Sequence, residues 1–265
     1  MNYTKREDST NHVIELLGRA FPSDAARLVR LPDDRPIVYV GDIHGDLDAV
    51  DTVFSRYPSP DHVLVFLGDI VDRGPHSADS LARIAEEKIK TPSSIHLLMG
   101  NHEARSICHF KPADFWDSLR NDQSERLSHH LEKLPLATWH SAGILATHGG
   151  LPNLPSLDRI NSIALGDSAW RAITWGDWVD KDTQMSGEGV KRPSFGPTAF
   201  AKRMAQLGVS IHIRSHQPTC PLYSFSDHCL TLFTTSEYGD GKRRIALLSP
   251  SHTIDSARDL ELIEI

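Results

Sequence analysis

Three segments of the chain share one pattern, in which an apolar run leads directly into a glycine and then into polar residues. The segments are residues 36–45 (PIVYVGDIHG), 62–74 (HVLVFLGDIVDRG) and 94–103 (SIHLLMGNHE). Each apolar run predicts a buried strand, and the glycine after it predicts a turn. Open α/β sheets carry their sites at the carboxyl ends of strands. We therefore expect the three polar loops to meet at one edge of a sheet.

The residues between these loops predict helices. Residues 47–54 and 77–90 place apolar side chains on one helical face, so residues 36–100 alternate strand, helix, strand, helix, strand. Right-handed crossovers between parallel strands would bring the three loops together. Asp46 and Asp48 fit the first turn of the helix after the first loop better than they fit a metal site.

Two histidines follow further strand-like runs. Residues 143–147 lead into His148, and residues 209–214 lead into His216. Taken alone, each of these histidines is as readily explained by a structural role as by a place in a functional site. Turn-forming residues follow both histidines, however, and favour the functional site. We interpret three other histidines as structural: His96, His140 and His212.

The side chains at these strand ends form a candidate set of metal ligands without thiolates. Oxygen and nitrogen donors of this kind suit Mn, Fe, Zn or Co better than a structural zinc site. One shared carboxylate could hold two cations about 3.5–4 Å apart. Asp69 lies in the middle loop and is our choice for the bridge. The set is Asp42, His44, Asp69, Asn101, His148 and His216.

The remaining segments predict a simple organisation. Residues 1–9 are expected to form a flexible tail, followed by a short helix from residue 10 or 11. Residues 183–193 are rich in Ser, Gly and charge and predict a mobile loop. Three strand-like runs follow one another without helices and predict an antiparallel second sheet. These runs are residues 229–234, 245–248 and 260–265.

Composition limits the function classes. The 265 residues carry a net charge of −7, which provides no field for gathering nucleic acid or anionic membrane. No apolar run reaches the roughly 20 residues of a membrane span. The polar N-terminus shows no secretory signal, and three irregularly spaced cysteines indicate a reducing compartment. We expect a cytoplasmic protein with no nucleic-acid or membrane partner, and the oligomeric state stays open.

The ordered motifs Gly-Asp-x-His-Gly, Gly-Asp-x-Val-Asp-Arg-Gly, Gly-Asn-His-Glu and His-Gly-Gly resemble those of the phosphoprotein phosphatases. These are metal-dependent Ser/Thr protein phosphatases within the calcineurin-like metallophosphoesterases. The resemblance extends over about residues 36–250. It implies a single catalytic domain over residues 1–265, an α/β fold with two mixed sheets flanked by helices, and two divalent metal ions. Mn²⁺ is the expected metal in vitro, with Fe and Zn left open.

The resemblance also implies residue roles. One metal would bind Asp42, His44 and Asp69, and the other would bind Asp69, Asn101, His148 and His216. Arg73 and Asn101 would hold phosphoryl oxygens. His102 would be the general acid, oriented by Asp72, while a metal-bridging hydroxide attacks phosphorus in line. A surface salt bridge is the alternative for Arg73, and Glu103 fits a structural role.

Two parts of the chain depart from the family pattern. The segment that carries a second phosphate-binding arginine is compressed here, so Arg192 is the candidate and Lys191 remains an alternative. The family's Ser-Ala-Pro-Asn-Tyr-Cys segment keeps only its tyrosine, Tyr238, which is a further candidate for phosphate binding. These departures bear on substrate preference.

The expected activity is hydrolysis of phosphoserine and phosphothreonine in proteins or peptides, with phosphotyrosine left open. A symmetrical dinucleoside-tetraphosphate hydrolase is the first alternative. A catalytically inactive phosphopeptide-binding protein is the second.

Overall fold

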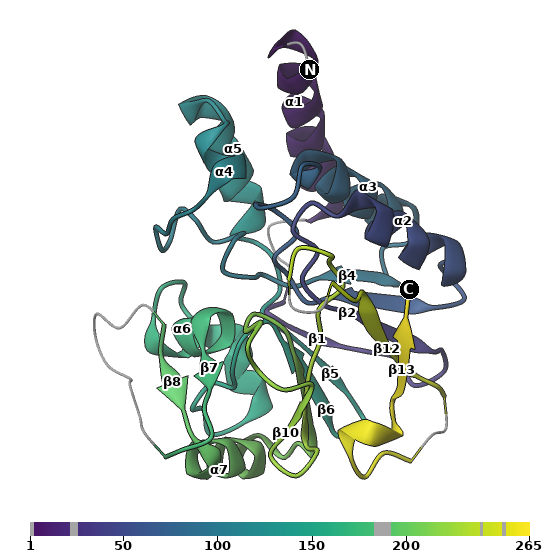
Figure 1. Ribbon diagram of the computed structural model, residues 1–265, viewed down its shortest axis with the longest axis vertical. Helices are drawn as coiled ribbons and strands as arrows, with labels where there is room; N and C mark the ends of the chain where they lie inside the picture. The colour runs from purple at the N-terminus through teal and green to yellow at the C-terminus, as the bar shows by residue number, and fades with distance from the viewer. Residues whose placement is uncertain (1–2, 22–25, 183–191, 239–240, 251–252) are drawn as a thin grey trace.

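The computed structural model describes residues 3–21, 26–182, 192–238, 241–250 and 253–265, with the side chains of the first helix described from Thr10 onward. Two sheets form the centre of the molecule, and helices lie on their outer faces (Figure 1). This confirms the predicted fold of two mixed sheets flanked by helices.

The first sheet has five strands in the order β13-β12-β2-β3-β4. Three of its members are the predicted strands that precede the ligand loops, and these three neighbours run parallel as expected. Helices α2 (Leu47–Arg56) and α3 (Ser77–Lys90) connect them. The strands are β2 (Ile37–Val40), β3 (Val63–Phe66), β4 (Ile95–Leu97), β12 (Arg244–Leu248) and β13 (Glu261–Glu264).

The second sheet has six strands in the order β1-β5-β6-β9-β11-β10. Strands β6 and β9, which precede His148 and His216, are parallel neighbours. The strands are β1 (Leu28–Arg30), β5 (Ala137–His140), β6 (Ile144–Thr147), β9 (Ile211–Arg214), β10 (Tyr223–Ser224) and β11 (Cys229–Thr231).

The predicted antiparallel second sheet of the last three runs is wrong. Strand β11 joins the six-stranded sheet parallel to β9, whereas β12 joins the five-stranded sheet antiparallel to β2, and β13 pairs antiparallel with β12. The direction of β11 depends on the chain reversal through β10, which local sequence does not reveal. The chain thus visits both sheets after residue 209 and ties them together.

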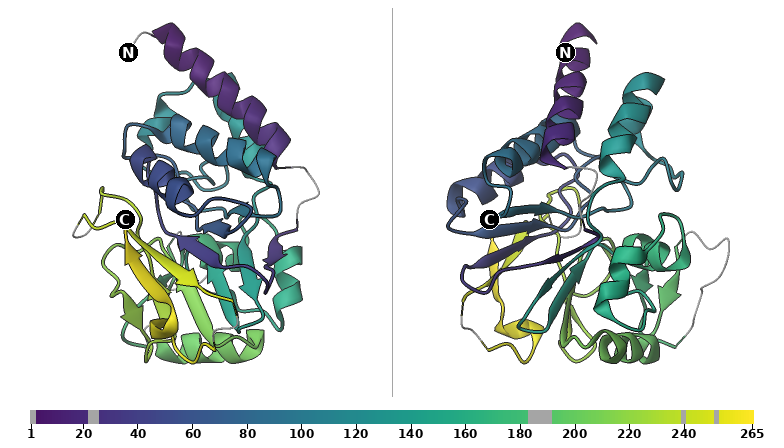
Figure 2. Two further views of the ribbon diagram at one scale, coloured as in Figure 1. Left: turned by 90° about the vertical axis from the view of Figure 1, so that its right-hand side faces the viewer. Right: turned by 180° about the vertical axis from the view of Figure 1, so that it is seen from behind.

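Both faces of strand β2 are buried, which explains its unbroken apolar sequence. Ile37 and Tyr39 point toward the core between the two sheets, where Ile211 also lies. Val38 and Val40 point to the other face and belong to the core beneath the helices. Figure 2 shows helices α1, α2 and α3 on that side of the five-stranded sheet and the second sheet on the other. Burial on both faces is typical of central parallel strands.

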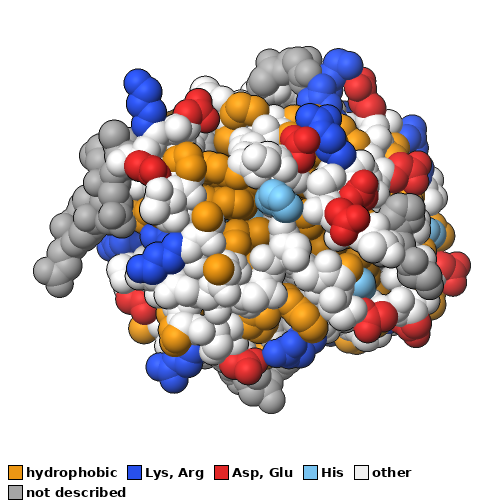
Figure 3. Space-filling view, turned by 90° about the horizontal axis from the view of Figure 1, so that it is seen from below, with side chains coloured by type: hydrophobic (Ala, Val, Ile, Leu, Met, Phe, Trp, Pro, Cys, Tyr) orange, Lys and Arg blue, Asp and Glu red, His pale blue; other side chains and the backbone are white. Residues whose placement is uncertain are grey.

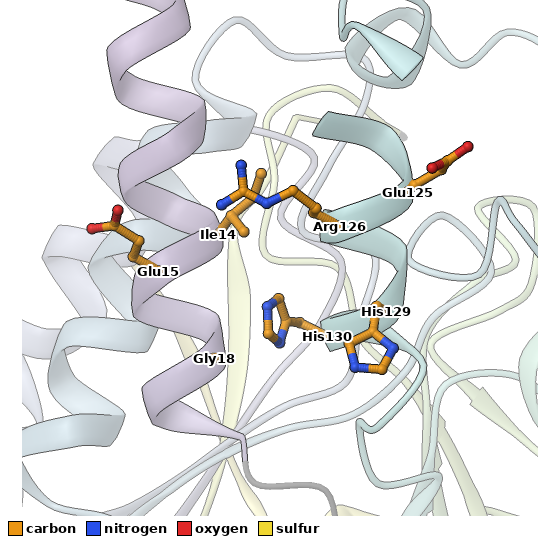
Figure 4. A pocket seen from close by; sticks show the side chains of 7 residues that line it. All are labelled: Ile14, Glu15, Gly18, Glu125, Arg126, His129 and His130. Carbon is orange, nitrogen blue, oxygen red and sulfur yellow. The ribbon is translucent and has the colours of Figure 1, made fainter. Parts of the chain in front are cut away.

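Helix α1 spans Tyr3–Ala20, so most of the flexible tail predicted for residues 1–9 is helical instead. No Pro or Gly interrupts residues 3–9. A helix that packing stabilises over residues 10–20 can therefore continue toward the N-terminus. Helix α1 packs against α3 and α5 (Asn121–Leu131). Between α1 and α5 lies a groove of about 440 Å³, into which Arg126 and His130 point (Figure 4).

The other elements lie beside the six-stranded sheet or in the connections. Figure 3 views the molecule from below, where hydrophobic side chains lie beside a histidine near the middle of the face and charged side chains stand farther out. Among the helices that the structure describes, none combines the length and hydrophobicity of a membrane span. The remaining elements are α4 (Asp114–Asp117), η1 (Leu157–Ser162), α6 (Ser168–Trp175), β7 (Asp177–Trp178), β8 (Ser194–Phe195), α7 (Pro197–Leu207) and η2 (Ala257–Asp259).

Candidate metal centre

The loops that follow β2, β3, β4, β6 and β9 converge, and all six predicted ligands are buried where they meet. Their side chains come from positions more than 170 residues apart in the sequence, yet they contact one another directly. For example, the backbone N–H of His216 lies 3.4 Å from Asp42 Oδ1, and His148 Nε2 lies 3.2 Å from Asn101 Oδ1. The ligands are Asp42, His44, Asp69, Asn101, His148 and His216.

Asp69 occupies the middle of this cluster. Its Oδ2 lies 3.3 Å from His148 Nε2 and 3.8 Å from His44 Nε2. Two groups of three potential ligand atoms, each within 4.8 Å, both include Asp69. One group adds His44 and His102, and the other adds His148 and His216. A carboxylate shared by two groups has the position expected of a bridging ligand.

Backbone carbonyls fix the orientation of two histidines. His44 Nδ1 donates to the carbonyl of Val71 over 2.8 Å, and His148 Nδ1 donates to that of Leu67 over 3.0 Å. Each ring therefore turns its Nε2 atom toward the carboxylates. Such hydrogen bonds from the second ring nitrogen are typical of metal-binding histidines.

Two buried atoms in the cluster lack a hydrogen-bond partner among the described residues. These are Asp42 Oδ2 and His216 Nε2. Burial and the nearby Asp69 raise the pKa of Asp42 to about 7. Burial would lower the pKa of His148, but Asp69 and Asp42 outweigh it and raise the pKa to about 9. The unpaired oxygen and nitrogen atoms can act as metal ligands, and the two adjacent carboxylates are stabilised by nearby positive charge. These residues therefore fit divalent metal ions.

Close contact between the second and third loops depends on two glycines and one carboxylate. A Cβ on Gly100 would lie 2.2 Å from Asp69 Oδ1, and one on Gly68 would lie 2.4 Å from the Gly100 nitrogen. The Glu103 carboxylate accepts hydrogen bonds from the backbone N–H groups of Gly100, Asp69 and Ile70. Glu103 thus joins the two loops, which is the structural role predicted for it.

Several site residues adopt positive φ angles, which non-glycine residues rarely do. The φ angles are 48° at His44, 52° at Asp69 and 72° at His216. Asp72 and Arg73 follow with 68° and 70°. Strained backbone of this kind is concentrated at functional sites, where the surrounding contacts hold it in place.

His102 and Asp72 form a short, buried pair. His102 Nδ1 lies 2.6 Å from Asp72 Oδ2, and Asp72 Oδ1 accepts the backbone N–H of Phe115. Burial would lower the pKa of His102, but Asp69 and Asp72 outweigh it and raise the pKa. The ring also lies edge-on to Phe110, with centroids 4.5 Å apart. These contacts hold the imidazole in one orientation beside the cluster and favour its charged form.

Arg73 and Tyr238 lie together at the mouth of the site. The Arg73 guanidinium carbon lies 5.2 Å from the centre of the Tyr238 ring, and the Tyr238 hydroxyl lies 3.0 Å from His44 Nε2. The backbone N–H of Arg73 donates to Asp114. The exposed Arg73 side chain thus rests on an aromatic ring, and these two of the predicted phosphate-binding residues border the cluster.

Arg192 is linked to the cluster through Asp177. Its guanidinium pairs with both carboxylate oxygens of Asp177, and Asp177 Oδ1 lies 3.8 Å from His216 Nε2. The alternative candidate Lys191, and most of the loop predicted at residues 183–193, lie outside the described residues. The sequence motif Trp-Gly-Asp, which ends at Asp177, marked this position, but we predicted no role for Asp177.

Asp46 caps helix α2 as predicted, accepting the Ala49 N–H over 3.1 Å. Sequence reasoning missed its other partners, Arg243 and Ser236, because nothing local connects residues almost 200 positions apart.

The model of the calcineurin-like phosphoesterase family matches residues 35–220. The chain is 26% identical over 261 residues to a probable serine/threonine-protein phosphatase of Encephalitozoon cuniculi. This match covers 92% of the chain and 56% of that relative, so the chain spans about half the length of the curated relative it matches.

Solved structures show the same fold. A protein serine/threonine phosphatase from Saccharomyces cerevisiae aligns with a TM-score of 0.77 at 23% identity, covering all of this chain and 90% of that one. A candidate diadenosine tetraphosphatase aligns with a TM-score of 0.60 at 18% identity, covering 91% of this chain and 98% of that one. A cold-active protein-tyrosine phosphatase of a Shewanella species gives 0.57 at 15%, covering 89% of this chain and 79% of that one.

Proposed function

The chain belongs to the calcineurin-like phosphoesterases, and we propose that it removes phosphate from phosphoserine and phosphothreonine residues of proteins, with phosphotyrosine as a further candidate substrate. The observation that carries this proposal is the central position of Asp69 between two groups of ligand atoms, with the His102–Asp72 pair beside them. The likeness to a serine/threonine-protein phosphatase over 92% of the chain supports the substrate class.

Two divalent cations are the proposed cofactors, held by Asp42, His44, Asp69 and, on the far side, by Asn101, His148 and His216. When bound, they would lower the pKa of water so that hydroxide forms near neutral pH, and they would stabilise negative charge on the phosphoryl oxygens. The oxygen and nitrogen donors favour Mn²⁺ in vitro, with Fe and Zn as alternatives.

The chain's own residues would perform the remaining tasks. Arg73, with its guanidinium above Tyr238, would bind the phosphoryl oxygens, and a planar fork of donors suits their geometry. Asn101 and Tyr238 would orient the same group from the other sides. Arg192 would contribute on release from Asp177, which holds its guanidinium close to His216.

His102 would protonate the leaving oxygen. A serine or threonine alkoxide is a poor leaving group, and a positioned acid contributes about 10²–10⁴-fold to the rate. Asp72 would keep the imidazole charged and oriented through the 2.6 Å contact at Nδ1, which leaves Nε2 as the atom that gives up the proton.

The proposed compartment is the cytoplasm, where thiols stay reduced. The three cysteines, Cys108, Cys220 and Cys229, are free in the structure. Phosphorylated proteins or peptides are the proposed partners.

A direct comparison of substrates tests the proposal. The kcat/KM of the Mn²⁺-loaded protein should be much larger on a phosphothreonine peptide than on diadenosine tetraphosphate. The reverse preference would make the chain a dinucleoside-tetraphosphate hydrolase with the same site. Tight binding of the phosphopeptide without turnover of either compound would make it a phosphopeptide reader.

A further inference from the structure

The segment that carries Tyr238 runs beside the first ligand loop and is bonded to it repeatedly. The Thr234 hydroxyl accepts the Gly41 N–H over 2.8 Å, and the Thr234 N–H donates to the Asp42 carbonyl over 3.1 Å. Four residues later, the Tyr238 hydroxyl meets His44 Nε2. The position of the phenol therefore depends on how this segment is held between its two ends.

The Asp46 carboxylate holds the middle of the segment. Its Oδ2 accepts both the N–H and the hydroxyl of Ser236, over 3.0 and 3.1 Å. The Arg243 guanidinium binds the same carboxylate through two nitrogens, over 2.9 and 2.7 Å, and reaches Asp48 with the third. Asp46 is thus shared by the start of helix α2, the Tyr238 segment and Arg243.

Arg243 is itself anchored. Its carbonyl accepts the Ile265 N–H over 2.9 Å, and the next residue, Arg244, donates its N–H to Phe233 over 2.8 Å. The Asp46 side chain is 5% exposed and that of Arg243 is 24% exposed. Paired, partly buried ions with bidentate geometry hold their positions better than exposed pairs do.

We propose that Asp46, Arg243 and Ser236 form a clasp that positions Tyr238, and through its ring Arg73, for binding the phosphoryl group. This inference rests on the proposed function, because it assigns the clasp to phosphate binding. The three residues are positioning residues and do not touch the substrate. Without the clasp, the segment would keep its attachment at Thr234 but lose its attachment at Ser236, two residues before Tyr238.

Another arginine provides a matched control. Arg83 also binds two carboxylates, Asp51 on helix α2 and Glu87, and its side chain is 29% exposed. Its guanidinium lies over the ring of Phe54, away from the ligand loops. Like Arg243, Arg83 thus pairs with a carboxylate of helix α2. Arg83→Ala removes this ion pair and leaves the Tyr238 segment unchanged.

The first measurement is the Kd of inorganic phosphate for the Mn²⁺-loaded protein, by calorimetry. Arg243→Ala should raise this Kd about tenfold, equivalent to 1.4 kcal/mol, with unchanged metal content. Asp46→Asn keeps a helix-capping side chain and should raise the Kd in the same direction, since it removes the charge that holds Arg243. Arg83→Ala should leave the Kd unchanged. Equal effects of Arg243→Ala and Arg83→Ala would overturn the proposal.

A double-mutant cycle separates positioning from general stability. Tyr238→Ala removes the side chain through which the clasp acts, so adding Arg243→Ala to it should change the phosphate Kd by less than about twofold. A tenfold effect in both backgrounds would show that Arg243 acts independently of Tyr238 and would overturn the proposal. Arg243→Lys, which keeps the charge but loses the bidentate geometry, should restore part of the affinity.

Hydrogen exchange of the metal-free protein tests the clasp without reference to activity. Amides of residues 234–238 should exchange faster in Arg243→Ala than in the wild type or Arg83→Ala. Unchanged exchange there would refute the clasp whatever the catalytic result. Faster exchange in Arg243→Ala, together with a wild type that hydrolyses no phosphate ester, would support the clasp and contradict the proposed function.

Discussion

At the scale of single residues, the site consists of groups that are costly to bury alone and are stabilised by one another. Asp42 and Asp69 are adjacent carboxylates, and His148 stands between them with a pKa raised to about 9. His102 is held by Asp72 from behind, so the charge of its imidazole is stabilised in place. The local sequence indicated Asp42, Asp69 and His148 as candidates because each lies within three residues of the end of a buried strand.

The general-acid role of His102 leads to a residue-level prediction. His102→Asn should lower kcat on phosphothreonine peptides by about 10²–10⁴-fold, because an alkoxide needs a proton to leave. The loss on an aryl phosphate should be much smaller, since a phenolate leaves unassisted. Metal content, measured by mass spectrometry, should stay at the wild-type level. Equal losses on both substrates would remove His102 from the acid role.

At the scale of elements, the strands that precede the three ligand loops were predictable, because buried parallel strands are nearly continuous apolar runs. Strand β1, with three residues, and β5, whose sequence is Ala-Thr-Trp-His, lack such a signal and were missed. The partners of β11, β12 and β13 depend on tertiary pairing, so the sequence indicated these strands but not that β11 runs parallel to β9 or that β12 and β13 belong to the first sheet. The Asp46–Arg243 contact could not be predicted because it also depends on tertiary structure.

The contact between the second and third loops gives an element-level prediction. Gly100→Ala would place a methyl group 2.2 Å from Asp69 Oδ1 and 2.8 Å from Glu103 Oε2, so the two loops must separate. Metal retention after gel filtration and turnover should both fall sharply.

A second glycine provides the control for this experiment. Gly208 ends helix α7 at a φ of 65°, and apart from its chain neighbours and the backbone of its own helix, no atom of the described residues lies within 4 Å of the point that a Cβ would occupy there. Gly208→Ala should cost about 1 kcal/mol of stability through backbone strain, yet keep wild-type metal content. Full metal retention in Gly100→Ala would contradict the close loop contact.

At the scale of the whole molecule, two sheets with a core between them hold five loops at one place, and helices cover the outer face of the first sheet. This arrangement tolerates strain at the site because the surrounding core is extensive. It also buries titratable groups far from the chemistry. One of these is His96 on β4, whose pKa is lowered to about 4 by burial and by the nearby Lys88 and Arg35.

His96 should make the stability of the whole protein sensitive to acid. Its pKa is about 4 when folded and about 6.5 when unfolded, so the unfolded chain binds the proton first as pH falls. The free energy of unfolding should therefore decrease between about pH 7 and pH 4. In urea titrations at pH 7.5 and 5, His96→Leu should lose less stability than the wild type, by about 1–2 kcal/mol. Parallel losses in the two proteins would contradict this account.

The central claim is that Asp69 joins two metal ions in one catalytic site, and counting bound metal together with turnover tests it most directly. After loading with Mn²⁺ and removal of unbound metal, the wild type should hold two ions per chain and hydrolyse a phosphothreonine peptide. Asp69→Asn should lose metal and turnover together. A wild type with fewer than two ions, or an Asp69→Asn protein that keeps both, would contradict the account.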